Sequence, residues 1–218
     1  MPTIGGPILE PPRAVIFDIG RVIIHVDFAR AFEVLGKGAG HSDLQVMRAL
    51  ETDPRWPDWQ EGRITPRDWY EHLTQKFKLS FSFDEFCRIW CSVLDPITIL
   101  PELLFERLGA TCSLALLSNI DPLHVAHIEA TFPFVRHFPV RVYSCHVGAS
   151  KPAPMIYHHA LREVGALPQE TMFIDDLREN VLAAAALGIN AFHFTSRDDL
   201  LSEFSRLGLW SAVPPEQA

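Results

Sequence analysis

Six polar residues stand at or just beyond the ends of short apolar runs, and their types suit the binding of a cation and an anion. They are Asp18, Ser118, Asn119, Lys151, Asp175 and Asp176. Carboxylates that converge raise one another's pKa values unless a cation lies among them, and Mg²⁺ is the hard divalent ion that prefers such oxygen ligands. Lys151 and the Ser118 hydroxyl are suited to hold the oxygens of an anion that bridges to the metal. These residue types indicate a phosphoryl-transfer site with Mg²⁺ as its cofactor.

Five apolar runs of strand length are predicted to position these residues. The runs are 14–18, 114–118, 140–144, 171–175 and 190–194. Helical patterns at 123–131, 154–164 and 180–187 separate the later runs, and Gly165 and Gly188 stand where helix ends need a left-handed residue. Strands that are apolar on both faces and alternate with helices predict a doubly wound α/β sheet. Parallel strands end at one edge of a sheet, so the polar end residues are expected to converge there.

The segment between the first two runs has a different pattern. Residues 28–94 contain no convincing strand but several amphipathic helical patterns, whose predicted N-caps are Asp27, Ser42, Thr65 and Ser82. We predict a helical cap at 27–95, inserted into an α/β core formed by 1–26 and 96–218. The cap is expected over the carboxyl edge of the sheet, where open α/β sheets bind ligands. Hinges for its motion are expected near 25–28 and 95–99.

Two features of the cap segment allow more than one interpretation. The run 36–40 ("GKGAG") lacks the preceding strand and the Lys-Ser/Thr ending of a phosphate-binding loop, so it is interpreted as a flexible connector between helices. The tryptophans of the segment are interpreted as packing anchors. The alternative for Trp56 and Trp59, which flank a proline-containing loop, is that they face the cleft.

Composition and charge narrow the classes of partner. With 218 residues, 48% hydrophobic and 21% charged, the chain suits a core with an inserted smaller unit. A formal charge of −8 argues against nucleic acid or an anionic membrane as partner, and no apolar run is long enough to span a bilayer. We expect no signal peptide, reduced cysteines, a cytoplasmic location and a frayed tail at 212–218. The sequence does not indicate the oligomeric state.

Four motifs, in order and suitably spaced, resemble those of the haloacid dehalogenase (HAD) superfamily of hydrolases. They are "VIFDIGRVI", "LALLSN", "SKPAPMIY" and "MFIDDLREN". The resemblance covers nearly the whole chain, and the first motif is similar to that of the glucose-1-phosphate phosphatase-like group, with Arg21 in place of an asparagine. It implies a Mg²⁺-dependent phosphatase that hydrolyses small phosphorylated metabolites, sugar phosphates among them.

The resemblance implies roles for the residues that contact the phosphoryl group. Asp18 would attack phosphorus and form an aspartyl-phosphate, which water then hydrolyses. Ser118 and the backbone N–H of Asn119 would hold the phosphoryl oxygens. Lys151 would neutralise charge as the transition state forms.

The resemblance also implies the metal ligands. Asp18, the main-chain carbonyl of Gly20 and Asp176 would bind Mg²⁺. Asp175 would be either a further ligand or the holder of a metal-bound water. The two neighbouring acids also suit the N-terminus of the following helix, which is compatible with metal binding.

Gly20 is the position at which this chain departs from most phosphatases of the superfamily, which carry an aspartic acid there. That acid protonates the leaving group, and general acid catalysis is typically worth ~10²–10⁴-fold. A glycine offers only its carbonyl, together with the strained backbone conformation that a sharp strand exit demands. We therefore expect a modest rate, a good leaving group such as an anomeric phosphate, or another proton donor, either His25 or a substrate hydroxyl. Arg21 and Arg178 are candidate substrate contacts, although surface arginines without such a role are commoner.

Two alternative functions remain open. A 2-haloacid dehalogenase uses its aspartate to attack carbon, needs no metal and also lacks the acid two residues after the nucleophile; the pair Asp175 and Asp176 weighs against it. A non-catalytic member of the same fold, which binds an anion without turnover, is kept open by Gly20.

Overall fold

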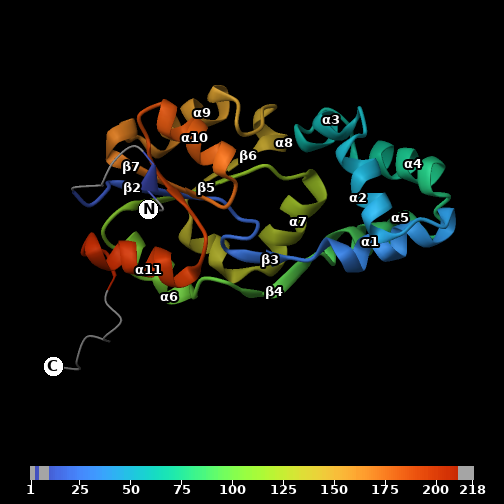
Figure 1. Cartoon of the computed structure of the whole chain (residues 1–218), viewed down its shortest axis with the longest axis horizontal. Coiled ribbons are helices and arrows are strands. Elements are labelled where there is room, and N and C mark those ends of the chain that lie inside the picture. Colours follow the sequence, from blue (N-terminus) through green and yellow to red (C-terminus); the bar gives the residue numbers. More distant parts are fainter. Residues whose placement is uncertain (1–2, 5–9, 211–218) are drawn as a thin grey trace.

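The five apolar runs pair into one parallel sheet. The structure is a computed structural model that describes residues 3–4 and 10–210, and its parallel strands lie in the order β8-β7-β2-β5-β6 (Figure 1). Their bounds are β2 Ala14–Phe17, β5 Ser113–Ser118, β6 Val140–Tyr143, β7 Thr171–Asp175 and β8 Asn190–His193, each within one residue of the prediction. A short strand that was not predicted, β1 (Thr3–Ile4), pairs antiparallel with β8. The tail 212–218 and most of the N-terminal segment lie outside the described residues.

Helices cover both faces of the sheet because successive strand residues point to opposite sides. Val15 and Phe17 of β2 belong to one hydrophobic core, and Ile16 between them belongs to the other. The helices on the first face are α6 (Glu102–Gly109), α7 (Pro122–Thr131) and α11 (Arg197–Arg206). Those on the second are α9 (Pro154–Val164) and α10 (Arg178–Ala186), on the opposite side in Figure 1. The short elements are α8 (Ser144–Val147) and the 3₁₀ helices η1 (Lys37–Ala39), η2 (Pro133–His137) and η3 (Pro168–Glu170).

The central strand ends at a topological switch point. From β2 the chain proceeds to β5 and β6 on one side of the sheet, and it later fills the other side with β7 and β8. Ligands of open α/β sheets bind at the carboxyl end of the strand where the order reverses. Asp18 follows β2 directly, and its backbone N–H still donates a hydrogen bond of 2.9 Å to the carbonyl oxygen of Ile174 in β7. The sheet thus places Asp18 at its switch point.

The inserted segment forms a helical cap, seen at the right of Figure 1. Its helices are α1 (Phe28–Gly36), α2 (Asp43–Glu51), α3 (Trp56–Gln60), α4 (Pro66–Phe77) and α5 (Phe83–Cys91). The predicted caps of α1, α2, α4 and α5 are confirmed, since the side chains of Asp27, Ser42, Thr65 and Ser82 each accept a hydrogen bond from a backbone N–H of the first turn. The run 36–40 joins α1 to α2 through η1, as a connector does, and Gly40 supplies a φ of 68°.

The cap has a hydrophobic core of its own, built around tryptophan. The rings of Trp59 and Trp69 stack with centroids 5.5 Å apart, and Trp90 packs edge-on against both. All three are buried, which agrees with their interpretation as packing anchors. Trp56 is half-buried and lines a cavity below the cap. Of the four cap tryptophans, Trp56 is therefore the one that is not buried.

A two-stranded antiparallel ribbon connects the cap to the core. It consists of β3 (Ile24–Val26) and β4 (Leu94–Thr98), two strands that were not predicted. The ribbon coincides with the segments expected to act as hinges. The hinges and the exact limits of the cap remain predictions.

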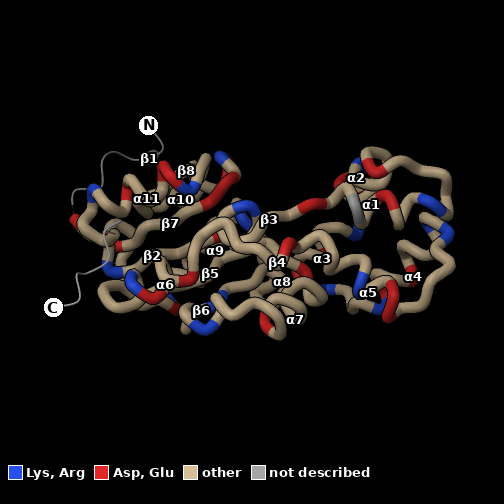
Figure 2. The backbone as a smooth tube through the Cα atoms, turned by 90° about the horizontal axis from the view of Figure 1, so that it is seen from below, with Lys and Arg blue, Asp and Glu red and all other residues tan. Residues whose placement is uncertain are grey.

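The distribution of charged residues, the hydropathy of the helices and the state of the cysteines can be compared with the expectations from composition. Acidic and basic residues are spread over both the core and the cap (Figure 2). No described helix combines the length and the hydropathy that crossing a bilayer requires. All four cysteines are free thiols.

Candidate active site

A buried lysine joins two strand-end carboxylates at the switch point. Lys151 Nζ lies 2.9 Å from Asp18 Oδ1 and 2.6 Å from Asp175 Oδ2, and it donates a hydrogen bond of 2.9 Å to the carbonyl oxygen of Leu117. These contacts use all three N–H donors of the ammonium group. The Lys151 side chain is only 1% exposed, so water screens its charge poorly. The predicted convergence of these residues is thus present in the structure.

The two neighbouring acids of the fourth motif have different surroundings. Asp175 is fully buried, and besides Lys151 its carboxylate accepts hydrogen bonds from the backbone N–H of Leu177 (2.8 Å) and from Asn180 Nδ2 (3.0 and 3.2 Å). Asp176 is half-buried and lines the cavity that also contains Asp18. Asp175 therefore fixes the position of Lys151, while Asp176 faces the cavity. The sequence did not predict that Asn180 hydrogen-bonds to Asp175.

Asn119 and Ser118 complete the polar wall of this cavity. Asn119 Nδ2 donates a hydrogen bond of 2.8 Å to the carbonyl oxygen of Lys151, and its Oδ1 accepts one of 2.7 Å from the Lys151 backbone N–H. Ser118, the last residue of β5, lines the cavity together with Lys151. The side chain of Asn119 thus positions Lys151, a role that the sequence did not suggest because the two residues are 32 positions apart.

The electrostatics of the site show an excess of negative charge. Burial raises the pKa of Asp18 to about 6, although Lys151 acts in the opposite direction. Burial and the charge of Asp175 raise the pKa of Asp176. Burial lowers the pKa of Lys151, but the two carboxylates outweigh it and hold that pKa above its usual value. One ammonium group does not balance three carboxylates, and a cation would relieve the repulsion.

The carboxylates are arranged as a divalent cation requires. Asp18, Asp175 and Asp176 each offer an oxygen, and these atoms lie within 4.8 Å of one another. Within the described part of the chain, this is the one such group of three or more His, Cys, Asp or Glu side chains. Oxygen donors of this kind suit Mg²⁺. The donor set and its charge therefore fit the cofactor that was predicted.

The strained residue of the first motif is Arg21 rather than Gly20. Arg21 has a φ of 58°, in the left-handed region, and its backbone N–H closes the turn on the carbonyl oxygen of Ile24 at 2.7 Å. Gly20 lies outside that region, so the expectation that it takes the strained conformation is wrong. The Arg21 guanidinium lies 5.9 Å from the ring centroid of Phe28, and the residue lines the cavity of Asp18.

Two other candidates lie away from this cavity. His25 is exposed on β3 and lines a neighbouring hollow with Asp95 and Arg197. His25 is not among the residues that line the cavity of Asp18, so the structure does not support it as the proton donor there. Arg178 is exposed at the start of α10 and is not part of the lining.

Comparison with known proteins identifies the family. A family model for haloacid dehalogenase-like hydrolases matches residues 12–188, a range that includes every residue of the site. The chain belongs to the HAD-like hydrolases. The predicted superfamily and fold class are thereby confirmed, as is the prediction of a hydrolase.

Two relatives of this HAD-like hydrolase are phosphatases. Sesquiterpene phosphatase astK of Aspergillus oryzae is 27% identical over 184 residues, which cover 84% of this chain and 90% of the relative. D-ribitol-5-phosphate phosphatase of Bacteroides thetaiotaomicron is 22% identical over 187 residues, with coverages of 83% and 90%. A crystal structure of a HAD family enzyme from Bacteroides thetaiotaomicron in complex with magnesium and inorganic phosphate is 25% identical, with a TM-score of 0.74 and coverages of 85% and 96%.

The cap of this HAD-like hydrolase also contacts the core beside the site. Ser144 Oγ, at the start of α8, donates a hydrogen bond of 2.7 Å to the carbonyl oxygen of Gln60 at the end of α3. Nearby, a Cβ added to Gly62 would lie 2.1 Å from the carbonyl oxygen of Cys145. This contact requires glycine and holds α3 close to the cavity.

Proposed function

We propose that this HAD-like hydrolase is a Mg²⁺-dependent phosphatase that hydrolyses small phosphorylated metabolites through an aspartyl-phosphate intermediate. The observation that supports this most strongly is the cluster of Asp18, Asp175 and Asp176 around the buried ammonium of Lys151. A nucleophilic carboxylate, a fixed positive charge and a cation site then lie at one point of the sheet edge.

In this proposal Asp18 is the nucleophile and the other residues bind and orient. One oxygen of Asp18 attacks phosphorus, while Ser118 Oγ and the backbone N–H of Asn119 hold phosphoryl oxygens. Lys151 offsets the negative charge that gathers as the new bond forms. Asp18, Asp176 and the carbonyl of Gly20 would hold Mg²⁺, and Asp175 positions Lys151. When bound, Mg²⁺ supplies a positive charge that lets the anionic phosphate approach the anionic nucleophile.

The leaving group departs without help from position 20. Among the described residues that line the cavity of Asp18, the acids are Asp18 and Asp176 themselves, and the remaining charged groups are Arg21 and Lys151. None is a free acid positioned for the leaving oxygen. Substrates whose leaving groups are stable as anions should therefore be favoured.

The test is phosphate release from a panel of phosphate monoesters, with Mg²⁺ and with EDTA, for the native protein and Asp18→Asn. We expect release that needs both Mg²⁺ and Asp18, and a drop of at least ~10³-fold in Asp18→Asn. Chloride release from a 2-haloacid in EDTA would instead establish the dehalogenase alternative. A Mg²⁺-dependent rise in Tm with a phosphate ester that is never consumed would establish a non-catalytic protein.

The polarity of the leaving group is a separate question. The two relatives are named for a sesquiterpene and for ribitol 5-phosphate, one an apolar and the other a polyol compound. The family therefore does not decide between sugar phosphates and apolar phosphates.

A further inference from the structure

A second cavity adjoins the one that contains Asp18. It has a volume of about 250 Å³ and shares Gly20, Ser118 and Asn119 with the cavity of Asp18. Water occupies ~30 Å³ per molecule in the liquid, so this space would hold about eight waters or one small ring system. A phosphoryl group placed at Asp18 would therefore direct its ester substituent toward this second cavity.

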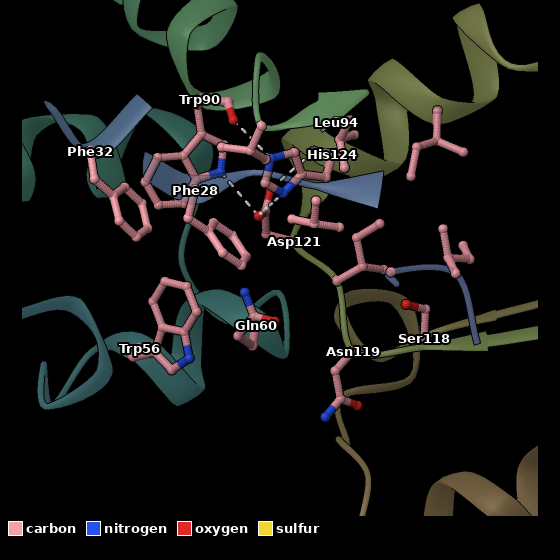
Figure 3. A pocket seen from close by; sticks show the side chains of 16 residues that line it. Phe28, Phe32, Trp56, Gln60, Trp90, Leu94, Ser118, Asn119, Asp121 and His124 are labelled. Atoms are coloured by element: carbon pink, nitrogen blue, oxygen red, sulfur yellow. Dashed lines mark hydrogen bonds and ion pairs between the residues drawn. The ribbon is translucent and has the colours of Figure 1, made fainter. Parts of the chain in front are cut away.

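The wall of this cavity is formed mainly by apolar and aromatic side chains from both the cap and the core. Figure 3 shows Phe28, Phe32, Trp56 and Trp90 of the cap around the space. The core contributes Ile19, Ile120 and Ile128. Aromatic rings on several sides favour a flat apolar substituent, because ring pairs add to the gain from buried area.

Asp121 and His124, the two titratable side chains in the cavity wall, already have partners within the protein. Asp121 Oδ2 accepts a hydrogen bond of 3.0 Å from Trp90 Nε1 and lies 2.7 Å from His124 Nδ1. His124 Nε2 donates to the carbonyl oxygen of Trp90 at 2.9 Å, and Asp121 Oδ1 accepts from two backbone N–H groups. Each hydroxyl of a polyol would need a partner here or lose its hydrogen bonds to water. These residues offer it none.

Gln60 differs from Asp121 and His124, and it lies away from Ser118, which the proposed function assigns to the phosphoryl group. Its side-chain amide points into the cavity in Figure 3, while its backbone carbonyl accepts the hydrogen bond from Ser144. One amide can hydrogen-bond to a single polar group on an otherwise apolar ligand. A ligand cavity with a few placed polar groups in an apolar wall is selective for that pattern.

We infer that the substrate is a phosphate monoester of an aromatic, largely apolar alcohol of the phenol class. This inference rests on the proposed function and assigns its substrate class. The ring system lies in the second cavity between Phe28 and Trp56, and Gln60 binds one polar substituent. An aryl leaving group also suits a site without an acid at position 20, because an aryloxide is a stable anion.

The chemical steps balance without an added reagent. A carboxylate oxygen of Asp18 forms the new bond to phosphorus as the bond from phosphorus to the aryl oxygen breaks. The electron pair leaves with the aryl oxygen, and the aryloxide takes a proton from solvent. Water then attacks the phosphorus of the aspartyl-phosphate, which regenerates the carboxylate and releases inorganic phosphate, with the proton passing to solvent.

The kinetic test compares phenyl phosphate with 1-naphthyl phosphate, whose leaving groups differ in apolar area but little in acidity. We expect kcat/KM to be about 10-fold higher for 1-naphthyl phosphate, mostly through KM, and higher for both than for glucose 6-phosphate. Acetyl phosphate, which has a good leaving group but places little in the cavity, measures the basal reaction. Equal values for the two aryl esters, or preference for glucose 6-phosphate, would overturn the inference.

Phe28→Ala and Phe83→Ala form a matched pair of variants. Each phenylalanine is the first residue of a cap helix and is half-buried against the cap core, but only Phe28 lines the cavity. Phe28→Ala should abolish the preference for 1-naphthyl phosphate over phenyl phosphate, which is read as the ratio of the two kcat/KM values within each variant. Phe83→Ala should keep the preference. If both variants lose the preference equally, the loss reflects a less stable cap, and the assignment of this cavity to the substrate is wrong.

Direct binding of 1-naphthol separates this inference from the proposed function. Calorimetry on the native protein should show binding that Phe28→Ala weakens and Phe83→Ala does not. Binding of 1-naphthol without phosphate release from any ester would support the cavity and refute the phosphatase. Phosphate release with no 1-naphthol binding would support the phosphatase and refute the substrate class.

Discussion

Trp90 of the cap and Asp121 of the core are joined by a hydrogen bond of 3.0 Å between Trp90 Nε1 and Asp121 Oδ2. His124 closes a ring with them, since its Nδ1 lies 2.7 Å from the same carboxylate oxygen and its Nε2 donates to the carbonyl oxygen of Trp90 at 2.9 Å. Both ring nitrogens of His124 face acceptors, so the imidazolium form satisfies both contacts. The contact between cap and core therefore contains a charged pair that is sensitive to pH.

The stability of the protein should decrease as His124 loses its proton. Burial lowers the pKa of His124, but the charge of Asp121 outweighs it and raises the pKa above 6.5. A raised histidine pKa contributes stability that is complete below ~6.5 and is lost as the pH rises through the raised value. We expect the Tm of the native protein to fall as the pH rises above about 6.5, and His124→Gln to flatten this fall.

His127→Gln is the control for that profile. Burial lowers the pKa of His127, so its contribution has the opposite sign and is lost as the pH falls. This variant should keep the decline of Tm above pH 6.5. An unchanged decline in His124→Gln would contradict the assignment to His124.

Lys151→Met should destabilise the protein strongly in the absence of metal. The change leaves the buried carboxylates of Asp18 and Asp175 without their cation, and breaking a buried pair in this way costs about 3–5 kcal/mol. Denaturant unfolding should show this loss, and added Mg²⁺ should recover part of it. Lys76→Met should lose less, because Lys76 is 29% exposed and His72 still contacts Asp53. Equal losses in the two variants would contradict this prediction.

Gly20→Asp should add a general acid to the site. A Cβ at Gly20 would lie 3.5 Å from Val26 Cγ2, an ordinary contact, and the backbone there is not left-handed. We expect kcat for alkyl phosphates to rise up to ~10²-fold, with little change for aryl phosphates, whose leaving groups need no proton. Gly20→Asn has the same shape without the acid. A similar gain in Gly20→Asn, or no gain in either variant, would show that protonation does not limit the rate.

Gly62→Ala should impair catalysis as well as stability. Both Gly62 (φ 69°) and Gly40 (φ 68°) of the cap are left-handed, so alanine strains either backbone by ~1–2 kcal/mol. Only at Gly62 does the added Cβ collide with the core, at Cys145. Gly40→Ala should therefore lower the free energy of unfolding alone, whereas Gly62→Ala should also lower kcat/KM by moving α3. Equal kcat/KM in the two variants would exclude a role for this contact in activity.

The sequence was sufficient to predict the elements that have strong local signals. Apolar runs such as 171–175 matched β7, and side chains such as Ser42 and Thr65 marked the helix starts, because capping is decided within a few residues. The grouping of Asp18 with Asp175 followed from the rule that parallel strands end at one edge. These inferences need only local pattern and topology.

Contacts between distant residues were not predictable in the same way. The ring of Trp90, Asp121 and His124 joins Trp90 to two residues that are more than 30 positions away. The strands β3 and β4 contain mostly exposed or half-buried residues and so lack the apolar run that signals a strand. The strained conformation was expected at Gly20, because glycine adopts unusual backbone angles most readily. It occurs at Arg21, where a φ of 58° is uncommon for a residue with a side chain.

The concentration of tryptophan in the cap has a spectroscopic consequence. Trp56, Trp59, Trp69 and Trp90 all belong to the cap segment, and only Trp210, which packs beside Arg107, lies on the core. Intrinsic fluorescence therefore reports almost entirely on the cap, whereas far-ultraviolet circular dichroism reports on both parts. Comparing the two signals during unfolding separates the melting of the cap from that of the core without any label.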